Sequence, residues 1–262
     1  MGRYVQRPLI LTLVSLALCL TGARLSGVCP KPRGQSATVS KHPFDAKKSI
    51  SELVNKNAAP KLVGQNDDWQ PLFDRRHDWK EDDRVAAAIA ELVGHGEEAL
   101  PELLKHFDDN EYCMTYKSSI VENADNYTVG WVCSVVADEL LSEAHCRYVP
   151  DGDVIIYHLR YAVGGNEGLR AWCLARKEKK LYELQIEQCE LVIPKILAAE
   201  DVDDSEKRKA VDSIRSEVKA LQKRRVPEAP SRFGERMSLS RFNREQAEEL
   251  RSKLANKAGR DR

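Results

Sequence analysis

The stretch of sequence that decides the fold is residues 83–109, which read DRVAAAIAELVGHGEEALPELLKHFDD. Apolar residues recur in both halves at the i, i+3, i+4 and i+7 spacing that buries one face of a helix. The two stripes are Val85, Ala88, Ile89 and Leu92, then Leu100, Leu103, Leu104 and Phe107. Gly94 and Gly96 separate the stripes and favour a turn there. The sequence therefore predicts two short amphipathic helices joined by a tight turn, with Asp82 or Asp83 capping the first helix.

The second half of this stretch, GEEALPELLKHFDD, resembles a HEAT-like repeat, in which two antiparallel helices stack on neighbouring pairs to form a curved solenoid. The resemblance covers residues 83–109 in one clear copy, whereas such solenoids usually need at least about three units. The segments YCMTYK, DNYTVGWVC and KKLYELQIEQCE are also similar to a group of uncharacterised exported bacterial proteins, a resemblance that implies no activity. Together these resemblances imply a mainly α, compact helical domain that contains one HEAT-like helical hairpin.

The rest of the chain divides into segments of different composition. Residues 24–48 are rich in Pro, Gly, Ser and Lys and predict a flexible leader. The helical HEAT-like domain is expected over 49–200, with one short strand near 153–162 and a buried helix as the alternative there. Residues 201–226 predict an amphipathic helix whose strict seven-residue seam packs within the chain or pairs with another chain. Residues 227–262 form a basic tail with a terminal helix.

Two segments within the helical domain are expected to lack regular structure. Residues 67–83 hold aromatic side chains among many charges, and residues 110–128 are polar and turn-prone. Val129 to Glu143 follows as a helix that is apolar over more than half of its circumference. Such a helix is expected at the centre of the core.

The N-terminus has the features of an export signal. Arg3 and Arg7 precede an apolar run from Leu9 to Leu20, which small residues follow up to Ala23. The run is too short for a comfortable bilayer span. Residues 1–23 therefore predict a signal peptide, and the protein is expected in the periplasm, the envelope or the extracellular medium. An uncleaved N-terminal anchor is the alternative; after signal removal no membrane span is expected.

The charge composition is balanced, with 41 Lys and Arg residues against 41 Asp and Glu residues. A net charge of zero gives no reason to expect nucleic acid or anionic lipid as a partner. The basic tail contains interleaved glutamates, which favours a solvated helical face over a polyanion site.

Six cysteines would remain after removal of the signal, and an oxidising compartment permits disulfides between them. These possible disulfide cysteines are Cys29, Cys113, Cys133, Cys146, Cys173 and Cys189. Two of them, Cys133 and Cys189, lie in apolar stripes that are typical of core faces. Full pairing, one or two bridges and no bridges all remain open.

No catalytic residue, cofactor site or metal site is predicted. The sequence contains no phosphate loop, no G-x-S-x-G elbow and no HExxH motif. The adjacent His145 and Cys146 do not face one another on a regular element, and His158 and Cys133 lack zinc-ligand spacing. The glycine-rich segment 164–168 is expected to form a turn and a helix cap rather than an anion site.

These observations favour a non-catalytic, exported protein-protein interaction module whose partner the sequence does not identify. Carboxylates are abundant in the chain, so an extracytoplasmic hydrolase with acidic catalytic residues is the alternative hypothesis. A redox or metal protein that uses the later cysteines is a third hypothesis.

Overall fold

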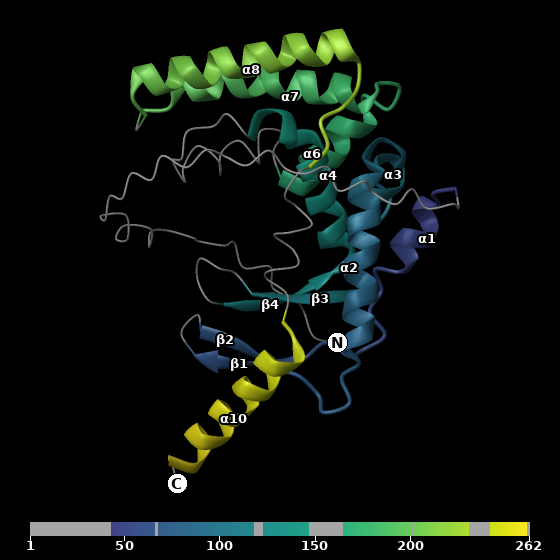
Figure 1. Ribbon diagram of the computed structural model, residues 1–262, viewed down its shortest axis with the longest axis vertical. Coiled ribbons are helices and arrows are strands. Elements are labelled where there is room, and N and C mark those ends of the chain that lie inside the picture. The colour runs from purple at the N-terminus through teal and green to yellow at the C-terminus, as the bar shows by residue number, and fades with distance from the viewer. Residues whose placement is uncertain are drawn as a thin grey trace, which may run out of the picture. The chain divides into compact units, whose positions relative to one another are not determined.

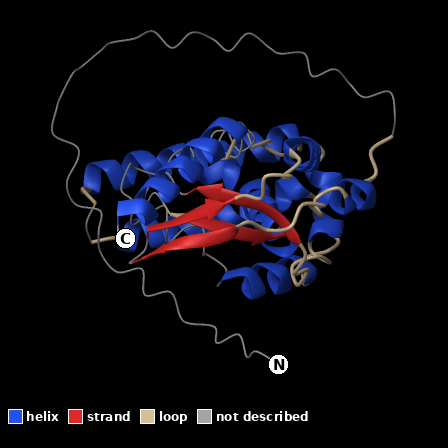
Figure 2. Ribbon diagram, turned by 90° about the horizontal axis from the view of Figure 1, so that it is seen from below, coloured by secondary structure: helices blue, strands red, loops and turns tan. Residues whose placement is uncertain are grey.

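A computed structural model describes residues 43–65, 68–117, 123–146, 165–200, 202–230 and 242–260. The structure is mainly α, as predicted, with two small pairs of strands (Figures 1 and 2). The predicted signal peptide, most of the predicted leader and the strand expected near 153–162 lie outside the described residues. Among the described residues, no helix combines the length and the apolar character that crossing a bilayer requires.

Along the chain, two pairs of strands separate three groups of described helices. The helices are α1 (Ala46–Ser51), α2 (Trp79–Gly94), α3 (Gly96–Leu103), α4 (Val129–Cys146), α6 (Gly165–Leu174), α7 (Leu181–Ala198), α8 (Asp204–Arg224) and α10 (Arg244–Arg260). The strands are β1 (Lys61–Gln65), β2 (Asp68–Leu72), β3 (Tyr112–Lys117) and β4 (Ala124–Thr128). β1 pairs antiparallel with β2, and β3 pairs antiparallel with β4.

The predicted pair of short helices corresponds to α2 and α3, with His95 as the single residue between them. The first predicted stripe is buried, and so are Leu100, Leu103 and Leu104 of the second. The last predicted member, Phe107, is only half-buried and lies beyond the end of α3 at Leu103. The first helix begins earlier than predicted because Asp78 is its N-cap and accepts a hydrogen bond from the Lys80 amide at 3.0 Å. Asp82, one of the two predicted caps, is instead a buried residue inside α2.

The helix α4 is central, as its wide apolar surface predicted. It contacts α2, α3, α7, α8 and both strands of the β3–β4 pair (Figure 1). The amides of Val129 and Gly130 donate hydrogen bonds of 2.9 Å to the carbonyls of Glu111 and Asp109. A Cβ atom at Gly130 would overlap the Phe107 carbonyl oxygen and lie 2.8 Å from the Asp109 carbonyl oxygen. The first turn of α4 therefore lies directly against the backbone of residues 107–111, which only glycine permits.

Gly96 has a packing role in addition to the predicted turn. A Cβ atom there would lie 2.5 Å from Cδ2 of Leu140 on α4. The start of α3 is buried against α4 at this point, and Gly94, by contrast, has open space where a Cβ would be. The two glycines, which look equivalent in the sequence, therefore play different roles.

Regular structure was not predicted for residues 67–83 and 110–128, yet they contain β2, the start of α2, β3 and β4. β3 contains a bulge at Cys113, since Tyr112 pairs with Thr128 whereas Met114 pairs with Tyr127. The bulge buries Cys113 and Met114 in succession and so removes the alternation that marks a strand in sequence. A two-stranded hairpin is marginal alone, and contacts with the rest of the fold supply its stability. One such contact is the hydrogen bond of 2.9 Å from Asn126 Nδ2 to the Pro60 carbonyl.

The helices α7 and α8 lie side by side (Figure 1) and enclose an apolar cluster of their own. The seven-residue seam of α8 faces this cluster and therefore packs within the chain, which is one of the two predicted alternatives. The members of the seam are Val211, Ile214, Val218 and Leu221. Fully buried Gln185 joins α7 to its surroundings by donating to the Leu140 carbonyl at 2.7 Å and the Glu228 carbonyl at 2.8 Å.

Replacing Gly130 with alanine is expected to lower the free energy of unfolding by about 3 kcal/mol, because the methyl group would collide with backbone atoms that cannot rotate away. Gly94→Ala is the matched control. It adds the same methyl group in open space and is expected to leave stability unchanged or raise it by up to about 1 kcal/mol. Urea unfolding followed by circular dichroism measures both values. Equal stabilities for the two variants would contradict the close contact at α4.

Candidate functional site

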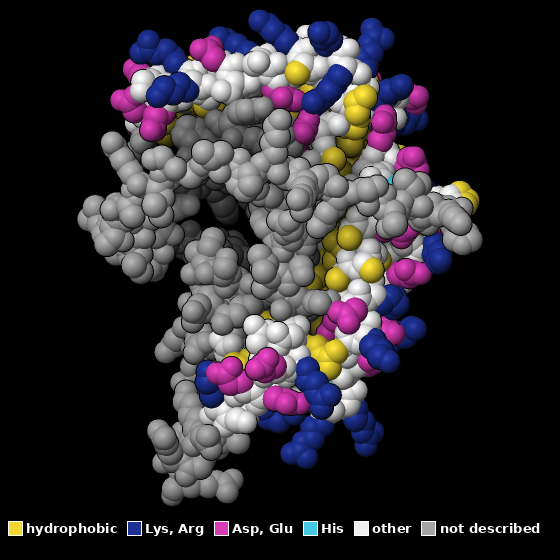
Figure 3. All heavy atoms as spheres, in the orientation of Figure 1, with side chains coloured by type: hydrophobic (Ala, Val, Ile, Leu, Met, Phe, Trp, Pro, Cys, Tyr) yellow, Lys and Arg dark blue, Asp and Glu magenta, His cyan; other side chains and the backbone are white. Residues whose placement is uncertain are grey.

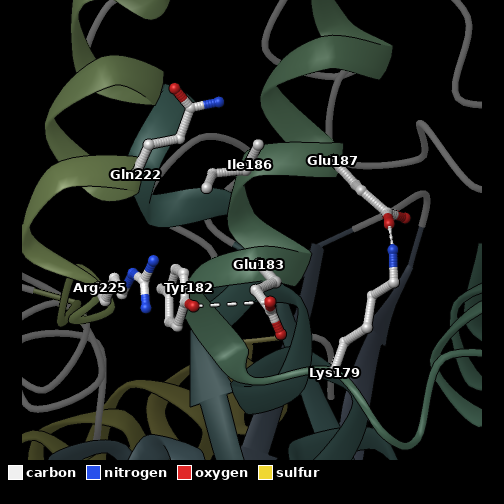
Figure 4. A pocket seen from close by; sticks show the side chains of 7 residues that line it. All are labelled: Lys179, Tyr182, Glu183, Ile186, Glu187, Gln222 and Arg225. Carbon is white, nitrogen blue, oxygen red and sulfur yellow. Dashed lines mark hydrogen bonds and ion pairs between the residues drawn. The ribbon is translucent and has the colours of Figure 1, made fainter.

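A groove of about 500 Å³ lies between the first half of α7 and the end of α8 (Figure 4). Its lining combines apolar, aromatic and charged side chains: Lys179, Tyr182, Glu183, Ile186, Glu187, Gln222 and Arg225. Five of these residues come from the start of α7 and the turn before it, and two come from the end of α8. Because α7 and α8 pair through their apolar seams, residues about forty positions apart line one surface.

The α7 side of the groove follows from helix periodicity. Tyr182 and Ile186 are four residues apart and therefore share one face of the helix. Both are half-buried and pack against the apolar cluster between α7 and α8. The first turn of α7 is held by a hydrogen bond of 2.8 Å from the Lys180 amide to the Glu183 carboxylate. The Tyr182 hydroxyl lies 3.5 Å from the same carboxylate (Figure 4). These contacts place an aromatic and an aliphatic side chain at the floor of the groove.

The α8 side of the groove depends on an unusual backbone conformation. Arg225 is the C-cap of α8 with a φ of 53°, and its amide donates to the Leu221 carbonyl at 2.8 Å. It is the one non-glycine residue with positive φ among the described residues. An L-residue in this left-handed region costs roughly 1–2 kcal/mol relative to glycine. The strain ends α8 at the groove and places the Arg225 side chain beside Tyr182 (Figure 4).

The charges along the α7 rim are held by ion pairs. Glu187 accepts hydrogen bonds from Lys179 and Arg176, and the Arg176 guanidinium also lies 4.4 Å from the centre of the Trp172 ring. Burial would raise the pKa of Glu187, but hydrogen bonds and charge attraction from Lys179 and Arg176 outweigh burial and lower this pKa below its usual value. Glu187 is therefore an ionised carboxylate that anchors two cations rather than a proton donor.

The predicted cysteines do not meet in this groove. Cys113, Cys133, Cys173 and Cys189 are all buried, and the first three carry free thiols. Burial raises the pKa of Cys133 and of Cys173 to about 12, and it raises the pKa of Cys113 further. Thiols with such pKa values are protonated at neutral pH and are poor nucleophiles.

Other predicted chemical residues fall outside the described side chains. Cys29 and His158 lie outside the described residues, whereas His145 and Cys146 are described only as part of the α4 backbone. The disulfide assignment that includes Cys29 and Cys146 therefore remains a prediction. Among the described residues, no group of three or more His, Cys, Asp or Glu side chains is arranged to hold a metal ion.

The sequence did not identify the groove, although the apolar helix face that contributes to it could be recognised. Tyr182 and Ile186 belong to an apolar stripe along α7 that reads as an ordinary core face. Gln222 and Arg225 lie at the polar end of a strongly charged helix and carry no motif. The groove arises from the pairing of α7 with α8, and periodicity alone does not specify which helices pair. The chain matches no known family model, and no curated protein or solved structure is significantly similar to it.

The raised thiol pKa values lead to a prediction about reactivity. In the native protein at pH 8, Cys113, Cys133 and Cys173 should react with iodoacetamide at least about a hundredfold more slowly than in the urea-unfolded protein. Peptide mass spectrometry after timed alkylation measures each site separately. Equal alkylation rates of Cys133 in the native and the unfolded protein would show an accessible thiolate and would support the redox hypothesis.

Proposed function

We propose that this chain is a non-catalytic protein-protein interaction module that binds its partner through the groove between α7 and α8. The observation that carries the proposal is the composition of the groove. Tyr182 and Ile186 form a half-buried floor, and Lys179, Glu187 and Arg225 supply charges at its edge. An apolar and aromatic centre with a polar rim is the usual anatomy of a protein interface.

Exposed apolar side chains on the segment from α6 to the end of α8 support the same proposal. Among the described residues, four of the six exposed large hydrophobic residues lie on or beside the α6–α8 segment. They are Leu174, Leu191, Leu197 and Val226. The surface that Figure 3 shows over α7 and α8 otherwise carries Lys and Arg interspersed with Asp and Glu. Val226 directly follows the groove residue Arg225, and an exposed apolar residue beside a groove on such a charged surface favours a protein partner.

The protonation states of Glu187 in the groove and of the buried thiols outside it favour binding over catalysis. A general acid needs a carboxyl group with a raised pKa, whereas the pKa of Glu187 is lowered. A thiol nucleophile needs a lowered pKa, whereas burial raises the pKa of Cys133 and of Cys173. The Lys179–Glu187 pair and Arg225 therefore form a charged rim rather than a set of catalytic groups.

We also propose that α2 and α3 form the HEAT-like hairpin and stack on α4 as a structural support for the binding surface. Contacts of α3 with α4, and of α4 with α7, support this role. The arrangement joins the hairpin to the groove through one continuous series of packed helices.

Filling the groove is expected to abolish partner binding. In Gln222→Trp the new indole would occupy the groove from an exposed position on α8, without removing a core side chain. Ser216→Trp is the control, because Ser216 is also an exposed, neutral residue of α8 and does not line the groove. Affinity capture from extracts of the cells that make the protein, with quantitative mass spectrometry, should recover a partner with the wild type and with Ser216→Trp. The recovered amount should fall at least about tenfold with Gln222→Trp, the loss expected for blocking an interface centre.

Two results would contradict the interaction proposal. One is equal recovery of every captured protein by the two tryptophan variants, which would place the binding surface elsewhere. The other is the absence of any protein that the wild type captures above a bait-free control. Thermal unfolding of both variants checks that the fold is retained.

We further propose that the protein is exported and that residues 1–23 are removed as a signal peptide. The support is the sequence, in which Arg3 and Arg7 precede a short apolar run that ends before Ala23. The mature protein outside the cytoplasm should therefore begin near Ala23, which N-terminal peptide mass spectrometry measures. An intact Met1 in the membrane fraction would instead indicate an uncleaved anchor.

A further inference from the structure

A second pocket, of about 470 Å³, lies between α10 and the turn that connects β2 to α2. Its lining shares no residue with the groove between α7 and α8. Four arginines and three carboxylates contribute to the lining, so guanidinium groups are in excess. Trp79 adds an aromatic residue to the lining, to which His77 also belongs. The pocket thus combines positive charge with an aromatic surface.

The turn that contributes half of the pocket is held at both of its ends. At its start, the Asp74 side chain accepts a hydrogen bond of 2.7 Å from the Arg76 amide, and the Asp74 carbonyl accepts one of 3.2 Å from the His77 amide. At its end, the Asn57 side chain accepts from the Asp78 amide and donates to the Asp78 carbonyl, both at 2.9 Å. Arg75 and Arg76 occupy the two central positions and are therefore presented from a fixed backbone.

A buried polar network supports the inner wall of the pocket. Nε2 of His77 lies 2.7 Å from one Asp82 carboxylate oxygen, and Asn55 donates to the other at 2.6 Å. The His77 side chain is 3% exposed and the Asp82 side chain is 10% exposed. The His77 ring also packs 4.5 Å from the Trp79 ring and 4.9 Å from the Phe73 ring, measured between centroids. These contacts fix the aromatic wall before any ligand binds.

The carboxylates that line the pocket already have partners. Asp74 accepts from the Arg76 amide, Asp78 caps α2 through the Lys80 amide, and Glu248 pairs with Arg244 at 3.0 Å. Among the described residues, the guanidinium groups of Arg75 and Arg76 have neither an ion pair nor a hydrogen bond. Two arginines of the turn therefore have their guanidinium N–H donors available for a ligand.

The helix α10 supplies the third available guanidinium. Phe242 and Ala247 pack with Phe73 in a small apolar cluster that docks the start of α10 on the turn. Arg251 donates one hydrogen bond of 2.9 Å to the Phe73 carbonyl, and its other N–H groups have no partner among the described residues. Arg75, Arg76 and Arg251 therefore surround the pocket from two segments that are far apart in the sequence.

We propose that this pocket binds the phosphate group of a small organic phosphomonoester. Guanidinium groups match phosphate oxygens in planar, often bidentate hydrogen bonds, and three of them suit a dianion. The organic part of the ligand packs against the Trp79 ring, which the buried His77 ring contacts. The proposal goes beyond the protein-binding groove, because it concerns another site and another class of ligand.

Calorimetric titration of the full-length protein with phenyl phosphate tests the site. Saturable binding at one site is expected, and the double variant Arg75→Gln/Arg76→Gln should weaken it at least about tenfold through the loss of charge-assisted hydrogen bonds. Arg215→Gln is the matched control, since Arg215 is an exposed arginine of α8 outside the pocket. Both glutamine variants alter exposed side chains and should retain the wild-type unfolding temperature. Absence of saturable binding at millimolar phenyl phosphate, or equal affinity in the double variant, would overturn the site.

Two further ligands test which groups of phenyl phosphate the pocket recognises. Benzoate keeps the ring but has a single negative charge, and it should bind at least about tenfold more weakly than phenyl phosphate. Inorganic phosphate lacks the ring and should also bind more weakly. Equal binding of benzoate would overturn the assignment to phosphate, and equal binding of inorganic phosphate would overturn the role of the aromatic wall. Hydrogen exchange at residues 244–251 should slow when phenyl phosphate binds, because the ligand bridges α10 and the turn.

Discussion

The contact between the first turn of α4 and the backbone of residues 107–111 is the constraint on which the rest of the structure depends. Gly130 allows the two backbones to touch, and its amide donates to the Asp109 carbonyl. Once α4 begins there, its other faces meet α3 at Gly96 and meet α7 near Gln185. The α7–α8 pair, and with it the groove, is therefore positioned by a close approach that lies about three turns of helix from Leu140, the residue of α4 that Gln185 contacts. A core helix that is fixed at one end by backbone hydrogen bonds has little freedom to slide when its neighbours are altered.

Helix periodicity predicted the helical part of this fold well, because the spacing of apolar residues within each helix indicates which of its faces is buried. α2, α3, α4 and α8 all correspond to predicted helices, within a few residues at their ends. The strands could not be predicted in the same way. β3 buries Cys113 and Met114 in succession at a bulge, and β1–β2 is stabilised by contacts with distant residues such as Asn123 and Asn126. The different roles of Gly94 and Gly96 were likewise invisible, since only the neighbouring helix distinguishes them.

The candidate sites were less predictable than the fold, because both combine segments that are distant in sequence. Tyr182 and Ile186 could be recognised as one helix face, but the groove also requires the end of α8 and the strained Arg225. The second pocket joins residues 74–79 to α10, whose few apolar residues gave no indication of where it docks. Asp82 shows the same limit of local reasoning. Its position suggested a helix cap, whereas the fold buries it between His77 and Asn55. The role of a charged residue near the start of a helix depends on which side chains the fold places beside it.

The apolar cluster between α7 and α8 also has a consequence for folding kinetics. Nearly all of its members lie between Tyr182 and Leu221, and Ala144 of α4 is the exception among its buried residues. Contacts between helices so close in sequence have a low cost of loop closure, and proteins rich in such contacts fold quickly. The α7–α8 pair can therefore assemble early and dock on α4 afterwards. The larger cluster, which joins Ile50 to Leu184, requires chain segments separated by most of the described sequence and forms later. The surface proposed to recognise a partner thus belongs to the part of the chain that is able to form its structure first.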